Sequence, residues 1–339
     1  MDLLRLPTPL RRCLISSSWL TTSTRPLTTQ TYRPTGDHEF PPPNTQPTTN
    51  TTLNTYTVSQ PPNQAQQKYA HNFFHSSPPH LLYTSAHFRS LPPTSIPEIA
   101  FLGRSNVGKS SLLNALFGRN KLKDAHVSKR PGRTRTMNGF GVLGPGQRLG
   151  AASASGEDKN ALWRRFPLRG GLVVVDMPGY GAGSRSIWGQ EAMKFLERRR
   201  QLRRTFVLVD AEHGLKKTDL EILVHLRRAG VAHQVVLSKV DKVLWSGARA
   251  PGPQKLQGRL RVLGEIRRKI GKAVDDEAGD GRKGLLGDVL ACSAEKSLEG
   301  HNKLGIDEVS ACGMECDEFG QRRQYSLDDL NILEEDEEE

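Results

Sequence analysis

Charged side chains are missing altogether from residues 41–67, where Pro, Thr, Asn and Gln predominate. A polar tract of this kind buries too little apolar surface to offset the conformational entropy lost when its backbone is ordered. We therefore expect residues 1 to about 80 to be mostly disordered. Residues 37–83 would form a linker, and the folded part would begin near residue 84.

Acidic residues are almost absent from residues 1–36, where Asp2 is the only one. The segment is also rich in Ser and Thr. A composition that is rich in these residues and in Arg, and poor in acids, is typical of a mitochondrial or plastid transit segment. Its arginines are Arg5, Arg11, Arg12, Arg25 and Arg33. Pro7 and Pro9 weaken the amphipathic helix that such a segment should form, and a basic disordered tail is the alternative. We expect residues 1–36 to direct the protein to the mitochondrial matrix.

Long apolar runs and cysteines are scarce as well. No run of 18 apolar residues exists, so the sequence predicts no transmembrane helix. The chain has four cysteines and no secretory signal, which favours free thiols over a disulfide framework. Cys312 and Cys316 lack a third and fourth ligand at useful spacing, so a metal clip is not indicated.

Positive charge is plentiful but unevenly distributed. The formal net charge is +12, yet residues 315–339 hold eleven acids against two arginines. The remaining chain carries 46 basic and 25 acidic side chains, a surplus of +21. A positive surplus of this size favours a polyanionic partner such as RNA. A solvated basic surface is the alternative. Residues 310–339 would form a degenerate acidic tail, and its last six residues, 334–339, are most simply a solubilising end.

A glycine-rich turn lies between an apolar run and a helical pattern. Residues 97–103, PEIAFLG, read as a buried strand, and residues 109–118, KSSLLNALFG, as a helix. The intervening GRSNVGKS fits G-x-x-x-x-G-K-[ST] at every fixed position. Backbone N–H groups and the helix N-terminus then converge on an anion, with Lys109 reaching the β- and γ-phosphates and Ser110 ligating Mg²⁺. This motif predicts a nucleoside triphosphate site without deciding between ATP and GTP.

A second apolar run, residues 171–176, ends in Asp176-x-x-Gly179. An acid at this strand end can hold Mg²⁺ through water, and the Gly179 N–H can meet the γ-phosphate and sense its loss. A strand that ends in Asp before a Pro-Gly turn is common by itself. Its position after the phosphate-binding motif favours the functional interpretation.

Two further strand ends carry residues suited to guanine. Residues 234–243, QVVLSKVDKV, place Asp241 where its carboxylate can accept both hydrogens from guanine N1 and N2. Adenine offers no such paired donors and would leave Asp241 unsatisfied. Lys239 can cover the base and brace the phosphate loop. In residues 285–296, the Ala294 N–H can meet guanine O6, although three residues prove little alone.

In this order the motifs resemble those of the EngB (YihA) type GTPases, P-loop proteins associated with assembly of the large ribosomal subunit. The resemblance covers residues 84 to about 309, and we expect a fungal-type mitochondrial member of this family. The matching stretches are PEIAFLGRSNVGKSSLLNAL, SKRPGRTRTMNGF, VVDMPGYG, WGQEAMKFLERRRQL, VLVDAEHGLKKTD, LSKVDK and ACSAEK.

The resemblance also implies a threonine that caps the nucleotide and ligates Mg²⁺ in residues 124–138. By its P-G-[KR]-T pattern this is Thr134, with Thr136 as the alternative, since either hydroxyl would reach a metal from a loop. We expect Lys109, Thr134 and Gly179 to carry the catalysis. The residues expected to bind GTP are Gly103, Arg104, Ser105, Asn106, Val107, Gly108, Lys109, Ser110, Ser111, Gly132, Arg133, Thr134, Arg135, Thr136, Asp176, Met177, Pro178, Gly179, Ser238, Lys239, Val240, Asp241, Cys292, Ser293 and Ala294.

Catalysis is expected to be slow. Ras-like enzymes orient the attacking water with a glutamine directly after D-x-x-G, whereas this chain has Tyr180. Either a partner supplies the missing group or a monovalent cation does, and Asn106 matches the position at which related GTPases hold K⁺. Arg104, Arg133 and Arg135 are candidate charge stabilisers, or surface cations.

Two stretches depart from the family pattern. Residues 144–168 form an insertion that we expect to be disordered, with Trp163, Arg164 and Arg165 as a candidate RNA contact. After residues 304–309 the closing helix of the family is expected to be short or missing, because the sequence beyond lacks helical periodicity.

Predicted strands and helices alternate along the chain. This order predicts a doubly wound α/β domain with a mostly parallel six-stranded sheet and helices on both faces. The expected strands are 97–103, 137–143, 171–176, 205–210, 233–238 and 286–292, and the expected helices are 108–117, 188–203, 217–229 and 254–272. The arginine-rich helix end 197–204 is the candidate rRNA contact, or a solvated helix end.

The expected function is a monomeric, Mg²⁺-dependent GTPase that binds GTP and GDP and acts on a large ribosomal subunit precursor. A GTP-binding RNA scaffold with little hydrolysis and an ATP-using P-loop enzyme are the alternatives.

Overall fold

The computed structural model describes residues 53–54, 61–118, 136–150, 162–167, 170–180, 186–245, 251–278, 289–297 and 303–314. Its centre is a seven-stranded sheet in the order β1-β3-β4-β2-β5-β6-β7. The strands are β1 (His80–Ser85), β2 (Glu98–Gly103), β3 (Met137–Leu143), β4 (Gly171–Asp176), β5 (Leu202–Asp210), β6 (His233–Ser238) and β7 (Val289–Ala291).

The five strands from β4 to β7 along the sheet are parallel, and β3 and β1 are antiparallel to their neighbours. Every residue of β2 and β4 is buried, as expected for strands covered on both faces. The register pairs Phe101 with Asp176 and Asp210 with Ser238, so the carboxyl ends of these strands finish at one edge. Ligand-binding loops of open α/β sheets gather at this edge.

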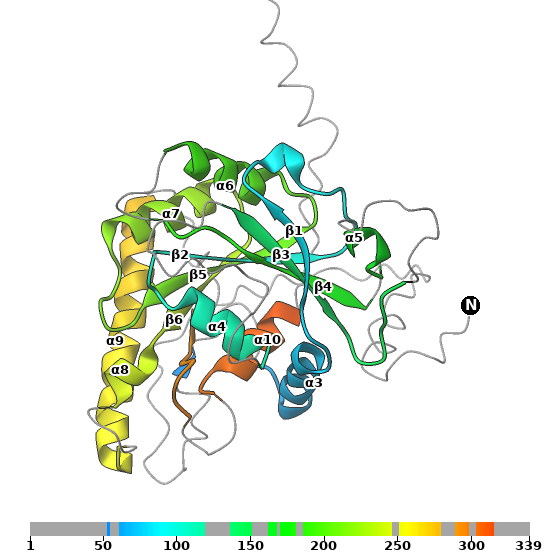
Figure 1. Ribbon diagram of the computed structural model, residues 1–339. Coiled ribbons are helices and arrows are strands. Elements are labelled where there is room, and N and C mark those ends of the chain that lie inside the picture. The colour runs from blue at the N-terminus through cyan, green and yellow to red at the C-terminus, as the bar shows by residue number, and fades with distance from the viewer. Residues whose placement is uncertain are drawn as a thin grey trace, which may run out of the picture. The chain divides into compact units, whose positions relative to one another are not determined.

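Helices cover both faces of the sheet (Figure 1). One face packs against α3 (Gln64–His75), α4 (Lys109–Leu116) and α10 (Ile306–Met314). The other packs against α6 (Ser186–Arg198), α7 (Lys217–Arg228), α8 (Val240–Leu244) and α9 (Pro253–Ala278). Successive residues of β2 alternate between the two cores, with Phe101 in one and Leu102 in the other, as the period of a strand requires.

The expectation that residues up to about 80 are disordered, with a linker as far as residue 83, is wrong for residues 61–83. They form α3 and most of β1, and β1 adds a seventh strand to the six expected. Helix α3 begins with a capping box in which Asn63 and Gln66 exchange hydrogen bonds. Phe73 and Phe74 then bury one side of the helix in the core.

One further expectation is confirmed and another is corrected. The closing helix is short, as expected: it is the nine-residue α10, which packs on α3 and α4. The insertion 144–168 is ordered at 144–150 and 162–167, where α5 (Leu162–Arg165) forms. Arg165 and Gly150 exchange hydrogen bonds of 2.8 and 2.9 Å, and Phe166 is buried beside Gly141 and Gly171.

The arginine-rich stretch 197–204 does not form one exposed helix end. Helix α6 ends at Arg198, and β5 begins at Leu202. Arg199 is buried and donates two hydrogen bonds, of 2.9 and 2.7 Å, to the carboxylate of Glu98. Arg199 is therefore part of the protein interior and is unavailable to RNA.

The described cysteines, Cys292 and Cys312, are thiols outside any disulfide, as expected, and both are buried. Burial raises the pKa of Cys292 to about 12, so this thiol stays protonated near neutral pH. Among the described residues, no helix combines the length and the apolar character needed to cross a membrane.

Glu308 in α10 is a buried carboxyl, only 2% exposed, and its burial raises its pKa from 4.5 to about 7. The folded state therefore holds a proton that the unfolded state has already released between these two values. Stability must fall as the pH rises through this window and level off above it.

We predict that Glu308→Gln stabilises the protein more at about pH 8 than at about pH 5, by about 2 kcal/mol, because the amide cannot ionise. Urea unfolding of both proteins at the two pH values measures this difference. The exposed Glu221→Gln is the control and should show no pH-dependent change. An equal effect of Glu308→Gln at both pH values would show that Glu308 is not a buried acid.

Candidate nucleotide-binding site

The phosphate-binding loop connects the end of β2 to the start of α4. Asn106 and Gly108 adopt left-handed backbone conformations, with φ of 68° and 99°. Gly108 also occupies the N-cap position of α4, which has no side-chain cap. The first N–H groups of this helix are therefore left for an anion to satisfy.

Two side chains from the end of β6 hold this loop in place. Ser238 Oγ donates hydrogen bonds to the carbonyl oxygens of Val107, at 2.7 Å, and of Val209, at 3.3 Å. Lys239 Nζ donates to the Asn106 carbonyl at 2.8 Å. The predicted bracing of the phosphate loop by Lys239 is thus confirmed.

The ammonium of Lys239 is itself held by a carboxylate that the sequence analysis did not identify. Its Nζ lies 2.8 Å from Asp210 Oδ2, at the end of β5. Burial opposes ionisation of Asp210, but the hydrogen bonds from Lys239 and His213 outweigh it and lower its pKa. The sequence places an Asp at a strand end here, which is the signal that could have identified it.

The two base-binding motifs meet at the next strand ends. Asp241 lies in the first turn of α8 and accepts a 2.7 Å hydrogen bond from Ser293 Oγ. Val240 N also donates to the Cys292 carbonyl, at 3.2 Å. A carboxylate has about four lone-pair sites, so Asp241 can hold Ser293 and still accept two hydrogens from a base.

The segment after β4 runs beside the phosphate loop. Tyr180 N donates to the Gly103 carbonyl at 3.1 Å, and Ser105 N donates to the Tyr180 carbonyl at 3.2 Å. Gly179 lies so close that a Cβ there would be 3.1 Å from Ser105 N and Oγ. The structure therefore brings the D-x-P-G segment and the phosphate loop together, as their predicted roles require.

Lys109 and Asp176 form an ion pair between the start of α4 and the end of β4. Asp176 is 7% exposed, and the ammonium compensates its buried charge. Ser110 is the next residue after Lys109 in the first turn of α4. A hydroxyl and a carboxylate are the hard oxygen donors that Mg²⁺ prefers, so the described residues fit this ion.

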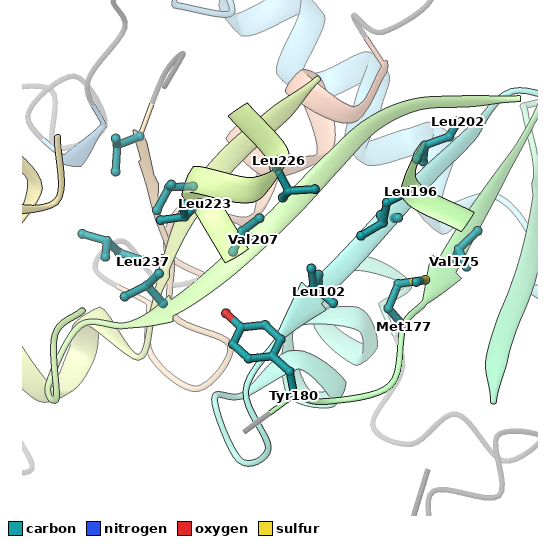
Figure 2. Packing of buried hydrophobic residues seen from close by; sticks show 14 of the residues in the cluster. Leu102, Val175, Met177, Tyr180, Leu196, Leu202, Val207, Leu223, Leu226 and Leu237 are labelled. Atoms are coloured by element: carbon teal, nitrogen blue, oxygen red, sulfur yellow. The ribbon is translucent and has the colours of Figure 1, made fainter. Parts of the chain in front are cut away.

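Tyr180 belongs to the core instead of facing the phosphate loop. Figure 2 shows its ring among Leu102, Val207 and other buried side chains. Its hydroxyl donates a 2.9 Å hydrogen bond to Asp219 in α7. Arg104 Nε lies 3.1 Å from the same Asp219 oxygen. The Tyr180 hydroxyl and Arg104 Nε therefore share Asp219 as a partner, which sequence reasoning missed.

The loop predicted to hold the nucleotide-capping threonine is largely outside the described residues. Gly132, Arg133, Thr134 and Arg135 all lie there. Thr136 is described, and its Oγ1 donates to Asn138 Oδ1 at 3.4 Å, at the start of β3. The assignment of Thr134 to Mg²⁺ and that of Asn106 to K⁺ both stay predictions.

Ser293 links the base-binding carboxylate to its loop, and its Oγ also accepts from Glu295 N and Lys296 N. We predict that Ser293→Ala lowers the free energy of unfolding by about 2 kcal/mol, because a charged hydrogen bond and two acceptor contacts are lost. Affinity for guanine nucleotides should fall with it.

Urea unfolding and titration with a fluorescent GDP analogue measure the two effects. Ser310→Ala is the control, because this buried hydroxyl bonds the Ile306 carbonyl within α10, at 2.8 Å. It should cost about 1 kcal/mol and leave the affinity unchanged. Equal affinities in wild type and Ser293→Ala would contradict the arrangement.

The chain matches known proteins over the same region. A family model described as "50S ribosome-binding GTPase" matches residues 98–239. The probable GTP-binding protein EngB of Sinorhizobium medicae is 38% identical over 226 residues, which cover 65% of this chain and 83% of the relative. The EngB protein of Rhodopseudomonas palustris strain TIE-1 is 41% identical over 169 residues, 48% of this chain.

The match with the Rhodopseudomonas protein spans 66% of that protein's own length. A crystal structure of a probable GTP-binding protein engB aligns with 65% of this chain and 97% of its own, at 19% identity and a TM-score of 0.37. With more than four fifths of the Sinorhizobium relative covered at 38% identity, the chain belongs to the EngB family of GTP-binding proteins.

Proposed function

We propose that this protein is a monomeric GTP-dependent switch that hydrolyses GTP slowly with Mg²⁺ and acts on a precursor of the large ribosomal subunit in mitochondria. The observation that best supports GTP binding is the hydrogen bond between Ser293 and Asp241 in the base-binding motifs. Lys239, from the same motif as Asp241, holds the phosphate loop through the Asn106 carbonyl. The description of the matching family as 50S ribosome-binding supports the ribosomal part. The basic N-terminal segment supports the mitochondrial part.

Binding begins with an exchange of partners at Lys109. The triphosphate attracts its ammonium away from Asp176, and the N–H groups at the start of α4 bind the phosphates. Ser110 directly, and Asp176 through water, would hold Mg²⁺, which would supply positive charge to offset that of the phosphates.

Slow hydrolysis follows from the placement of Tyr180. Its hydroxyl is committed to Asp219, so the residue directly after Gly179 has no polar group to orient an attacking water. The same observation favours a second candidate, a GTP-binding scaffold with little hydrolysis. The two differ in whether ribosomal precursors accelerate phosphate release.

Helix α9 offers an exposed basic surface in addition to Arg198 and Arg200, the exposed arginines of the stretch 197–204. Arg261, Arg268 and Lys272 are exposed and recur every seven and four residues, which places them on one side of the helix. We assign the contact with rRNA to this surface, because phosphate groups bind clustered cations.

For base selection, we predict that Asp241→Asn weakens GDP binding by at least about 100-fold, because an amide cannot accept both guanine hydrogens. Xanthosine diphosphate, which presents an acceptor at that position, should gain affinity. Competition of GDP, ADP and xanthosine diphosphate against a fluorescent nucleotide measures this. The exposed Asp276→Asn is the control. A preference for GDP retained in Asp241→Asn would show that Asp241 does not select the base, and equal competition by ADP in wild type would favour the ATP-using alternative.

For the ribosomal partner, we predict that the tagged protein sediments with large-subunit precursors from isolated mitochondria when a non-hydrolysable GTP analogue is present. With GDP it should remain near the top of the gradient. Changing Arg261, Arg268 and Lys272 together to Glu should abolish the association, because the charge that binds phosphates is reversed.

The matched control changes Lys68, Lys194 and Lys217, exposed lysines on other helices, to Glu. This variant has the same net charge as the α9 variant and should still sediment with the precursors. Equal loss in both variants would reject α9 as the contact, and sedimentation that ignores the nucleotide would reject the switch.

A further inference from the structure

Asp219 is a fully buried carboxylate in the first turn of α7 that joins three segments of the site. Its Oδ1 accepts from the Tyr180 hydroxyl at 2.9 Å and lies 3.1 Å from Arg104 Nε. Its Oδ2 accepts from Lys216 N at 2.9 Å. The phosphate loop, the segment after β4 and helix α7 therefore converge on one side chain.

The buried charge of Asp219 stabilises the contacts between Asp219, Tyr180 and Arg104. A buried carboxylate is costly unless it is paired and hydrogen-bonded. Burial, together with the charge of Asp219, raises the pKa of Tyr180 well above its ordinary value, so the phenol remains a donor near neutral pH. Arg104 Nε is buried and has no hydrogen bond, so it is the charge of Asp219 that holds it.

The position of Gly179 depends on this anchor. Tyr180 pairs with Arg104 as a parallel bridge, and its backbone exchanges hydrogen bonds with Gly103 and Ser105. With the ring buried and its hydroxyl held, the backbone just before Tyr180 has little freedom. Gly179 is thereby fixed against Ser105, beside the phosphate loop.

We propose that Asp219 is a positioning residue, which through Tyr180 and Arg104 keeps the Gly179 N–H ready for the third phosphate and thus sets the preference of the site for GTP over GDP. The inference rests on the proposed GTP site. A preorganised donor costs less ordering entropy on binding than a mobile one. Because GDP has no third phosphate, its affinity depends much less on this donor.

A second cluster of the same kind lies away from the site and provides a matched control. Tyr83 is buried and donates to Glu98 at 3.3 Å, and Glu98 is paired with Arg199. Glu98 begins β2, whereas Gly103, which ends β2, begins the phosphate loop. Tyr83→Phe removes the same chemical group as Tyr180→Phe, without contact with the nucleotide segments.

The test is the ratio of two dissociation constants, for a non-hydrolysable GTP analogue and for GDP, in wild type, Tyr180→Phe and Tyr83→Phe. We expect Tyr180→Phe to weaken the GTP analogue about three- to tenfold and GDP less than about twofold. Tyr83→Phe should lower the melting temperature comparably and leave the ratio unchanged. Asp219→Asn should shift the ratio in the same direction as Tyr180→Phe.

An unchanged ratio in Tyr180→Phe, with tight binding by wild type, would overturn the inference and leave the proposed function intact. The same holds if Tyr83→Phe shifts the ratio equally, because the effect would then be one of general stability. Absence of GTP and GDP binding by wild type would instead refute the proposed function, and the inference with it.

Discussion

The site depends on two hydrogen bonds that fasten the phosphate loop to the base-binding loop. Ser238 Oγ and Lys239 Nζ bind the carbonyls of Val107 and Asn106, at 2.7 and 2.8 Å. These bonds stabilise a loop that contains two left-handed residues, a conformation that costs energy at Asn106. Because the same β6 end leads to Asp241, the group that selects the base and the loop that holds the phosphates keep a fixed separation.

The sheet makes this fastening possible. Parallel pairing of β2, β4, β5, β6 and β7 places their carboxyl ends at one edge, and each end contributes one part of the site. Both faces of the sheet are buried, and α3 and α10 help to cover one of them. These two helices contact each other, although they come from the two ends of the described chain. Residues that lie far outside the nucleotide motifs therefore hold the strands that present them.

The sequence predicted those parts of the site that follow a local rule. Asp176, Ser238 and Asp241 each lie at or just after a strand end, and the structure places them so. Asp219 could not be predicted as their neighbour, because its bond with Tyr180 joins residues 39 apart and leaves no periodic pattern. Arg199 looked exposed within a run of arginines, but Glu98 on a distant strand compensates its charge. Helix α3 was missed because the polar tract before it outweighed the capping residues Asn63 and Gln66.

The central claim is that one site on this chain binds a guanine nucleotide through Asp241 and the braced phosphate loop. Calorimetric titration of the unmodified protein with GDP and then with ADP, both with Mg²⁺, tests it most directly. The account predicts saturable binding of one GDP per chain and no measurable heat of binding for ADP. Equal binding of the two nucleotides, or none of GDP, would contradict it.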